Sequence, residues 1–439
     1  MVVNTHSDTF LLDAYSGAGG FANGGYLVRH PRESEEKLAR RKALAIYPNF
    51  VRKSVNTYLG FLWRRPPVRE TDDLYARFSE NADGAGHDID HAMMSYQRLA
   101  MLLGTVYVIV DKPAALARTR AEEPLPYLSV RLPGQLIQYQ LDEFGRFVSV
   151  VFQEQDVDAG MRFRRFDLYG WQLALDPEGR NVIDRGEYSL GRPPVVRLHA
   201  NHPINPADVR AVSWAQDLAR LNFDLYNLRS ELRELLRSQT FAILALPVSD
   251  PAERERLTDL TVSTENALLY DPAGGGQPGF IAPPDGPVRM YMDQIAATVG
   301  DIYRVANLEF VGGVQQSGVA LSFHFQEANA ALMTLADLSE RAEIEIADLV
   351  YAWMGMKWAG NISYPRDFNL TDLAQALGQA LDAVSLDISP GFDAALKKRV
   401  ARQILGDDVA PSEMESILKE IEAGGDSGRR RIQSAAGNG

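Results

Sequence analysis

Two long helical patterns with a seven-residue period constrain this chain more than any other feature. The first lies within residues 206–238, where leucines alternate steps of three and four and therefore share one helix face. The second runs from Leu321 to Trp353 over about 50 Å, at about 1.5 Å per residue, which exceeds the width of a small domain. A leucine face of this kind needs a partner to pack against. The face in the first pattern consists of Leu218, Leu221, Leu225, Leu228, Leu232 and Leu235.

Periodicity alone does not decide between a coiled coil and the core helices of a large α-rich protein. The charges add a second observation. Residues 206–238 carry five acidic and five basic side chains, whereas residues 291–355 carry nine acidic side chains against Arg304 and Arg341, a net charge of −7. Such an acidic helical stretch suggests that part of its surface faces something the protein must not bind tightly.

Composition excludes several classes of protein. The chain has no cysteine among its 439 residues, so disulfides, thiolate metal sites and a cysteine nucleophile are excluded. Its longest apolar run, residues 241–248, is far shorter than the roughly 20 residues that cross a bilayer. The first ten residues lack the basic segment of a signal peptide. We therefore expect a soluble protein made in a cytoplasm.

The net charge of −13 argues against a protein that holds nucleic acid statically, because such binding depends on clustered Lys and Arg. It does not argue against a protein that nucleic acid must slide past.

The N-terminal part of the chain changes from helical to strand patterns. Residues 1–29 hold closely spaced glycines and are expected to form a loosely ordered arm. A helix is predicted over 31–63, broken or kinked by Pro48, and a second over 89–103. Strands are predicted at 105–110, 128–132, 135–141, 147–153, 162–169 and 195–198, with a hairpin turn at 142–146. These mostly antiparallel strands joined to helices predict an α+β fold.

A small α/β insert separates the two long helical patterns. Strands are predicted at 241–246 and 267–270, with a short helix at 251–260 between them. A returning helix over 291–310 then leads into the glycine-bearing loop 311–318. The longest helix follows from Val319, with Ser317 as its N-cap, and ends near Gly355 or Gly360. Short helices are predicted at 370–384, 390–405 and 412–423, before a disordered tail at 424–439.

Catalytic motifs give no defensible active site. The sequence contains no phosphate-binding GxxxxGK[ST], no HExxH and no GxSxG. His87 and His91 are four residues apart and could share a helix face as metal ligands, but no third ligand is marked by spacing. The simpler interpretation is a polar helix start, with Asp88 and Asp90 complementing the helix dipole. His324 lies in an apolar context that favours a hydrogen-bonded structural histidine.

Several motifs, taken with the order of the parts, resemble those of one protein family. They are Tyr47-Pro48-Asn49 followed by Gly60 and Arg64-Arg65-Pro66-Pro67, then Gly104 with the strand Val108–Pro113, and Ser317-Gly318-Val319-Ala320-Leu321 at the start of the longest helix. Together they cover most of residues 31–420 and resemble the portal protein of tailed bacteriophages.

The resemblance implies a ring, usually a dodecamer, at one vertex of a viral capsid, with a wing, two stem helices, a small α/β clip, a long kinked helix and a helical crown. It implies the following division: a flexible arm (1–29), the wing (30–205), a stem helix (206–238), the clip (239–290), a second stem helix (291–310), the tunnel loop (311–318), the long wing helix with its connection (319–369), the crown (370–423) and a disordered tail (424–439).

The resemblance also implies roles for residues and partners. The tunnel loop would face double-stranded DNA, and the six leucines would pack on the neighbouring subunit. The implied partners are the terminase large subunit, a head-to-tail adaptor, and the major capsid and scaffold proteins, in a virion assembled in the host cytoplasm. No cofactor, metal, catalytic residue or membrane is implied. The tunnel-loop residues are Gly312, Gly313, Val314, Gln315, Gln316 and Ser317.

Two other hypotheses remain open. A soluble metal-dependent enzyme of unknown reaction predicts a monomer or small oligomer with a bound metal or cofactor. A coiled-coil structural scaffold predicts an elongated dimer, but leaves the β region and the insert without a purpose.

Overall fold

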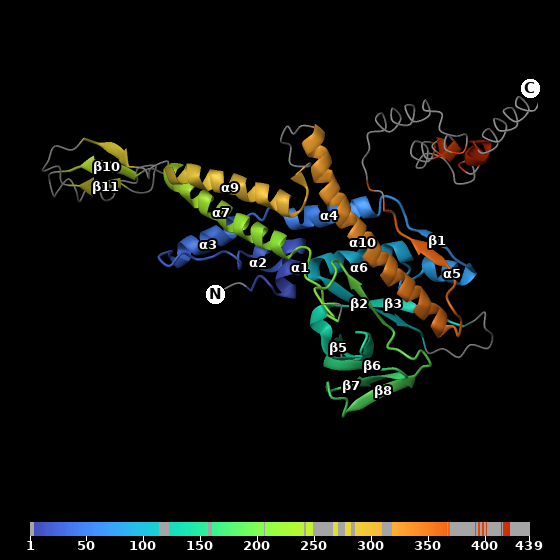
Figure 1. Ribbon diagram of the computed structural model, residues 1–439. Coiled ribbons are helices and arrows are strands. Elements are labelled where there is room, and N and C mark those ends of the chain that lie inside the picture. Colours follow the sequence, from blue (N-terminus) through green and yellow to red (C-terminus); the bar gives the residue numbers. More distant parts are fainter. Residues whose placement is uncertain are drawn as a thin grey trace, which may run out of the picture. The chain divides into compact units, whose positions relative to one another are not determined.

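The computed structural model describes residues 4–113, 123–156, 160–205, 207–240, 243–248, 267–270, 277–281, 286–309, 318–366 and 368, with isolated residues between 391 and 421. The chain divides into two compact units, residues 1–368 and 369–439. Almost all described residues lie in the first unit, which combines helices with mostly antiparallel sheets (Figure 1). The α+β prediction is confirmed.

The N-terminal segment is folded, so the prediction of a loosely ordered arm is wrong for residues 4–29. Helix α1 (Asp8–Ser16) begins at Ser7, whose hydroxyl accepts a hydrogen bond from the Phe10 amide at 3.2 Å. Phe10 and Phe21 are buried in the main core, the latter in the short helix α2 (Gly19–Ala22). The many glycines suggested disorder, but the aromatic side chains between them bury enough apolar surface to hold the segment.

The predicted helix over 31–63 is two helices, as Pro48 indicated. Helix α3 (Glu35–Leu44) and helix α4 (Phe50–Leu62) are separated by the extended residues 45–49. The Asn49 side chain caps α4 by accepting a hydrogen bond from the Arg52 amide at 2.7 Å. Helix α5 (Asp73–Glu80) and helix α6 (Ile89–Leu103) follow, and α6 has the predicted bounds.

Two antiparallel sheets form most of the β region. The order β3–β2–β9 places β2 (Thr105–Asp111) between β3 (Tyr127–Arg131) and β9 (Val195–His199), with Ile109 opposite both Ser129 and Val195. A second sheet has five strands in sequence order and includes two that the sequence analysis missed, β7 and β8. Its strands are β4 (Leu136–Leu141), β5 (Phe147–Asp156), β6 (Gly160–Phe166), β7 (Gly170–Ala174) and β8 (Val182–Glu187).

The predicted hairpin turn at 142–146 joins β4 to β5. The Asp142 carbonyl accepts the Gly145 amide at 3.0 Å, and Gly145 has a φ of 76°, which glycine adopts without strain. Farther along the chain, β1 (Val68–Glu70) pairs antiparallel with β13 (Asn361–Ser363). This pairing joins the segment that follows the longest helix to the segment that follows α4.

The first long helix begins later than predicted. Helix α7 spans Gln216–Thr240, because residues before it form turns that are held by side chains. The Ala211 amide donates to the Thr105 hydroxyl at 2.8 Å, and the Ser213 hydroxyl donates to the Leu102 carbonyl at 2.6 Å. These contacts compete with the helical hydrogen bonds that residues 206–215 would otherwise make.

The insert between the long helices contains a three-stranded sheet in the order β11–β10–β12. Its central strand β10 (Ile243–Pro247) pairs parallel with β11 (Ala267–Tyr270) and antiparallel with β12 (Gly279–Ile281). Both predicted strands are therefore present. Strand β12 was missed because it follows a glycine- and proline-rich run that indicates a loop.

The returning helix α9 spans Gly286–Val305, earlier at both ends than predicted. Pro287 lies in its first turn, where the missing N–H costs nothing, and Asn307 has a φ of 50° that ends the helical path. Helix α10 (Gly318–Trp353) is one continuous helix and ends two residues before Gly355, as expected. The main core joins side chains from α1, α4, α6, α7, α10 and β2.

Several predictions lie outside the described residues. They are the helix at 251–260, the loop 311–317, the tail 424–439 and most of the helices expected within 370–423. None of the helices in the described part of the chain combines the length and apolar composition that a bilayer crossing requires.

Candidate assembly interface

Helices α7 and α9 pack side by side and form the framework of the candidate site (Figure 1). The insert that contains β10, β11 and β12 connects the end of α7 to the start of α9 in the sequence, so the two helices form a hairpin with the insert at its turn. The Tyr291 hydroxyl of α9 donates a hydrogen bond to Glu231 of α7 at 2.9 Å.

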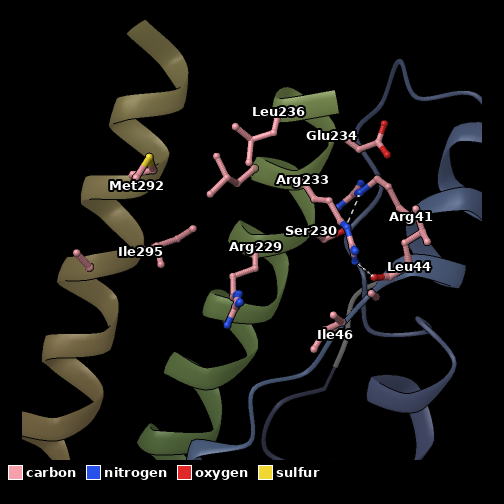
Figure 2. A pocket seen from close by; sticks show the side chains of 13 residues that line it. Arg41, Leu44, Ile46, Arg229, Ser230, Arg233, Glu234, Leu236, Met292 and Ile295 are labelled. Atoms are coloured by element: carbon pink, nitrogen blue, oxygen red, sulfur yellow. Dashed lines mark hydrogen bonds between the residues drawn. The ribbon is translucent and has the colours of Figure 1, made fainter. Parts of the chain in front are cut away.

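An apolar groove of about 590 Å³ lies along this hairpin, between α7, α9 and the segment that joins α3 to α4. Figure 2 shows Ile295 and Met292 on one side, facing Leu236 across the groove, with Leu44 and Ile46 on the α3–α4 side. Ile46 is 63% exposed and Met292 is 57% exposed. Exposed apolar side chains gathered in one concave place make this groove a candidate docking surface.

The leucine face predicted for contact with another subunit divides into two halves. Leu218 and Leu225 are each 1% exposed, and Leu221 packs against the same core. Leu218 and Leu225 are therefore covered by their own chain and leave no surface for a neighbouring subunit, whereas Leu221 is only half-buried, so its contact with a neighbour stays a prediction. Leu228, Leu232 and Leu235 are half-buried, and Leu232 lines the groove, so their contact with a second subunit stays a prediction.

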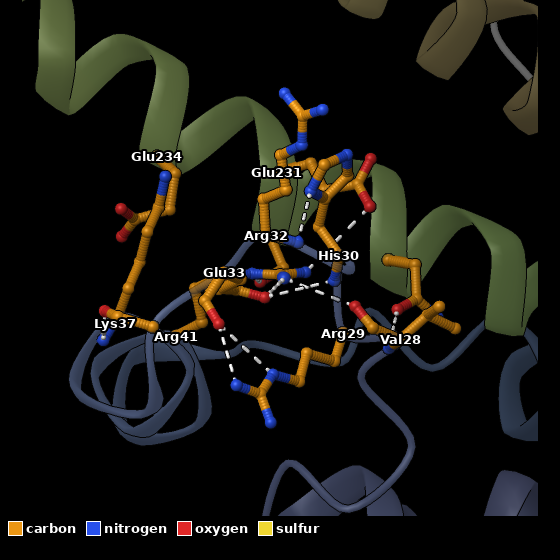
Figure 3. A network of polar contacts seen from close by, with 12 residues as sticks. Val28, Arg29, His30, Arg32, Glu33, Lys37, Arg41, Glu231 and Glu234 are labelled. Atoms are coloured by element: carbon orange, nitrogen blue, oxygen red, sulfur yellow. Dashed lines mark hydrogen bonds and ion pairs between the residues drawn. The ribbon is translucent and has the colours of Figure 1, made fainter. Parts of the chain in front are cut away.

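A buried ion pair holds one wall of the groove. Arg41 of α3 is nearly inaccessible, and its Nη1 lies 2.8 Å from a carboxylate oxygen of Glu33, which is equally buried. Its Nε donates to the Ser230 hydroxyl of α7 at 3.1 Å, and its Nη2 is 4.0 Å from Glu231. Figure 3 shows Arg41 and Glu33 beside α7, which carries Glu231.

Further hydrogen bonds attach the N-terminal segment to α7. The Asn227 side chain accepts the Val28 amide at 2.8 Å and donates to the Tyr26 carbonyl at 3.3 Å. Arg233 donates to the Leu44 carbonyl at the end of α3. These hydrogen bonds attach the N-terminal segment to α7 and so help to hold the groove wall in place.

Asn222 positions the α3–α4 segment beside α7. This buried side chain donates to the Pro48 carbonyl at 2.8 Å and accepts the Phe50 amide at 2.9 Å, the first amide of α4. It therefore satisfies one of the amides that a helix start leaves without an internal partner. The fixed segment presents Ile46 to the groove.

Part of the acidic surplus that the sequence shows in residues 291–355 is paired with arginines from other segments. Glu343 is buried and pairs with Arg69 of β1, with Nε to Oε1 at 2.5 Å. Asp337 and Glu340 both pair with Arg366, at 3.3 and 2.8 Å. Arginines outside α10 therefore neutralise much of the negative charge in its second half. A count of charges along α10 alone does not detect these pairs.

The tunnel-loop residues Gly312, Gly313, Val314, Gln315, Gln316 and Ser317 lie outside the described residues, as does the side chain of His324. Whether the loop faces DNA stays a prediction.

The two histidines considered as metal ligands lie next to each other, but their contacts are with each other and with Asp83. The rings of His87 and His91 stack with centroids 4.8 Å apart, and His87 Nδ1 lies 2.6 Å from Asp83. Asp88 caps α6 by accepting the His91 amide at 2.8 Å, as the simpler interpretation expected. Over the described residues, no group of three or more His, Cys, Asp or Glu side chains could hold a metal ion.

Sequence reasoning did not find the groove or its supports. Ile46 and Met292 lie on segments far apart in the chain, and neither belongs to a periodic pattern that marks a shared surface. The one available signal was Pro48. It indicated a break after α3 but did not indicate that the segment between α3 and α4 lines a groove.

No family model matches the chain, and no curated protein does. Solved structures of gene transfer agent particles contain chains with a similar fold. One, from the virion of a native gene transfer agent particle, is 16% identical, with a TM-score of 0.42. Another, from the neck of an empty particle computed with C6 symmetry, is 13% identical with a TM-score of 0.45. A third, from the neck of a native particle computed with C12 symmetry, is 16% identical with a TM-score of 0.43. Each match covers 94% of this chain and 99% of the other chain.

Proposed function

We propose that this chain is a portal protein, a subunit of the ring-shaped channel at one capsid vertex through which double-stranded DNA is packaged and ejected. The observation that carries the proposal is the α7–α9 hairpin, which carries a small sheet at its turn and an exposed apolar groove along its side. The motif resemblance of residues 31–420 supports the same assignment.

A groove on one side of the subunit is compatible with a ring, because it can receive a different surface of the next subunit. A subunit that presents a groove on one side and a complementary face on the other makes a head-to-tail contact, and a cyclic arrangement repeats that contact until the ring closes. In this proposal Ile46 and Met292 receive the neighbouring subunit, and the half-buried Leu228, Leu232 and Leu235 extend the contact.

The remaining parts then have specific roles. Helices α7 and α9 are the stem, and residues 239–290 are the clip that meets the terminase motor and later the head-to-tail adaptor. Residues 311–318 form the tunnel loop, in which uncharged Gln315 and Gln316 contact DNA weakly and glycines allow the backbone to move. Residues 370–423 are the crown.

The protein itself is proposed to be a passive conduit, with ATP hydrolysis supplied by the terminase large subunit. Its own residues position DNA and partners but carry out no reaction. Intrinsic ATP hydrolysis by the purified protein that rises on addition of DNA would contradict this part of the proposal.

Imaging of the purified full chain by negative-stain electron microscopy tests the assembly directly, with mass measured by light scattering on the same fraction. We expect rings with a central hole and a mass of about twelve chains, the usual portal stoichiometry. A compact, homogeneous dimer that carries a metal ion would exclude the portal proposal and favour the enzyme hypothesis.

A further inference from the structure

A second, polar pocket lies away from the groove, where the five-stranded sheet, strand β9 and helix α10 meet. Its volume is about 320 Å³, enough for a small ligand together with several water molecules at about 30 Å³ each. Three arginines line it, and we call it the arginine pocket: Arg146 from the β4–β5 turn, Arg192 from the segment before β9, and Arg197 from β9. This concentration of positive charge occurs in a chain whose net charge is −13.

Arg197 has a fixed orientation and an unused donor. Its Nη2 donates to the Gly145 carbonyl at 2.9 Å, and its guanidinium lies over the Phe147 ring, 5.2 Å from the centroid. Its Nη1 is buried and has no hydrogen-bond partner among the described residues. Leaving a charged donor buried and unpaired is unfavourable, and an anion in the pocket would remove that penalty.

Arg192 is the second arginine of the pocket that has no contact ion pair. It is half-buried beside Pro193, and it makes no hydrogen bond or ion pair within the described part of the chain. The fixed backbone dihedral of Pro193 restricts where the Arg192 backbone can lie. Two guanidinium groups without carboxylate partners therefore line one cavity.

Neither carboxylate of the pocket is in ion-pair contact with these two arginines, although Glu345 is close enough to attract both. Asp142 is committed to its own turn, where it accepts the Phe144 and Arg146 amides at 2.9 and 2.8 Å and pairs with Arg146 Nε at 2.8 Å. Glu345 of α10 lines the pocket but forms no ion pair with Arg192 or Arg197. Surrounding protein desolvates its carboxyl and raises its pKa, although the two arginines oppose that shift.

We propose that the arginine pocket binds a small oxyanion, a phosphate or carboxylate group, between Arg192 and Arg197. Planar guanidinium groups match both kinds of group, because each offers two parallel N–H donors to two oxygens. Glu345 stands beside the site and weakens binding by charge repulsion. This inference is independent of the proposed channel function.

Isothermal titration calorimetry on the purified full chain tests the site with inorganic phosphate, acetate and chloride at constant ionic strength. We expect saturable binding of phosphate or of acetate, and the stronger of the two identifies the group that the pocket prefers. We expect no saturable binding of chloride, which cannot accept two parallel hydrogen bonds. Equal heats with all three salts, or no binding, would overturn the proposal.

Three variants locate the binding. R192A and R197A are each expected to weaken it at least about tenfold, since each removes a charged donor. R180A, at an exposed arginine in the β7–β8 turn outside the pocket, is the matched control and should leave affinity unchanged.

The variant E345Q separates an anion site from arginines that serve only to balance Glu345. It keeps the size of the side chain and removes the nearby negative charge, so an anion site should bind several times more tightly. If R197A does not fold, R192A and E345Q still decide the question. Unchanged or weaker anion binding by E345Q would contradict the proposed placement.

Discussion

The Glu343 carboxylate of α10 is fully buried and lies against the Arg69 guanidinium of β1, with Oε2 3.1 Å from Nη2. The hydroxyls of Tyr75 and Tyr364 also donate to this carboxylate, at 2.8 and 2.6 Å. Burial, together with the adjacent Glu343, raises the pKa of both tyrosines well above the usual value, so both remain donors. One carboxylate of α10 thus holds together α10, β1, α5 and the segment after β13.

Removing Arg69 should therefore destabilise the protein strongly. The variant R69M leaves the Glu343 charge buried without its countercharge, and we expect a loss of about 3–5 kcal/mol in the free energy of unfolding. The measurement is urea unfolding followed by circular dichroism. The control R366M breaks the more exposed pair with Glu340 and should cost no more than about 1 kcal/mol. Equal losses in the two variants would show that the buried pair has no special role.

His199 should make stability depend on pH between about 6.5 and about 4. Burial, with smaller contributions from Arg197 and His202, lowers the pKa of His199 to about 4 from its ordinary value of 6.5. In this window the unfolded chain binds a proton that the folded chain excludes, so stability falls as the pH falls. The full loss is about 3 kcal/mol, reached near pH 4.

The variant H199Q tests this assignment, because glutamine can still hydrogen-bond the Thr105 hydroxyl, which lies 2.8 Å from His199 Nδ1, but cannot titrate. Unfolding free energies measured from pH 7 to pH 4 should fall less steeply in H199Q than in the unchanged protein. Parallel curves would assign the acid sensitivity to other groups.

Two glycines should respond oppositely to alanine. Gly104 has a φ of 85°, and an added Cβ would lie 2.0 Å from the Ala211 carbonyl oxygen, so G104A should cost more than about 2 kcal/mol. Gly60 lies within α4, where an added Cβ would meet no atom within 4 Å, so G60A should stabilise by about 0.5–1 kcal/mol. Thermal unfolding measures both. A stabilising G104A would contradict the close approach of residue 211.

The helices and strands that were predicted correctly from the sequence are determined by residues within or next to them. Helix α6 has an apolar period and an Asp88 cap, and β2 is a run of β-formers that ends at a proline segment. The break between α3 and α4 followed from Pro48. In each case the residues that determine the element lie inside it or next to it.

The parts that the sequence missed depend on contacts between distant segments. The start of α7 is delayed by Thr105 and Ser213, and the N-terminal segment is held by Asn227 and Arg41. Strand β7 contains only five residues and has no clear alternation, so its pairing with β6 supplies the structure that its own sequence does not signal. The candidate groove was hidden for the same reason, since its walls come from three separate stretches.

A charged side chain placed in that groove should prevent assembly without unfolding the subunit. Ile46 is exposed in the single chain, so I46D removes little of the subunit's own packing, but in a ring it would place a charged carboxylate against the apolar surface of the neighbour. We expect I46D to lower the mass measured by light scattering from that of a ring to that of a monomer, with an unchanged circular dichroism spectrum. The matched control is I204D, because Ile204 is 87% exposed and does not line the groove.

If both variants formed rings as readily as the unchanged protein, the subunit contact would have to lie elsewhere, and Leu228 and Leu235 would be the next positions to change. If I46D alone failed to assemble, the groove between α7, α9 and the α3–α4 segment would be the surface through which each subunit holds the next.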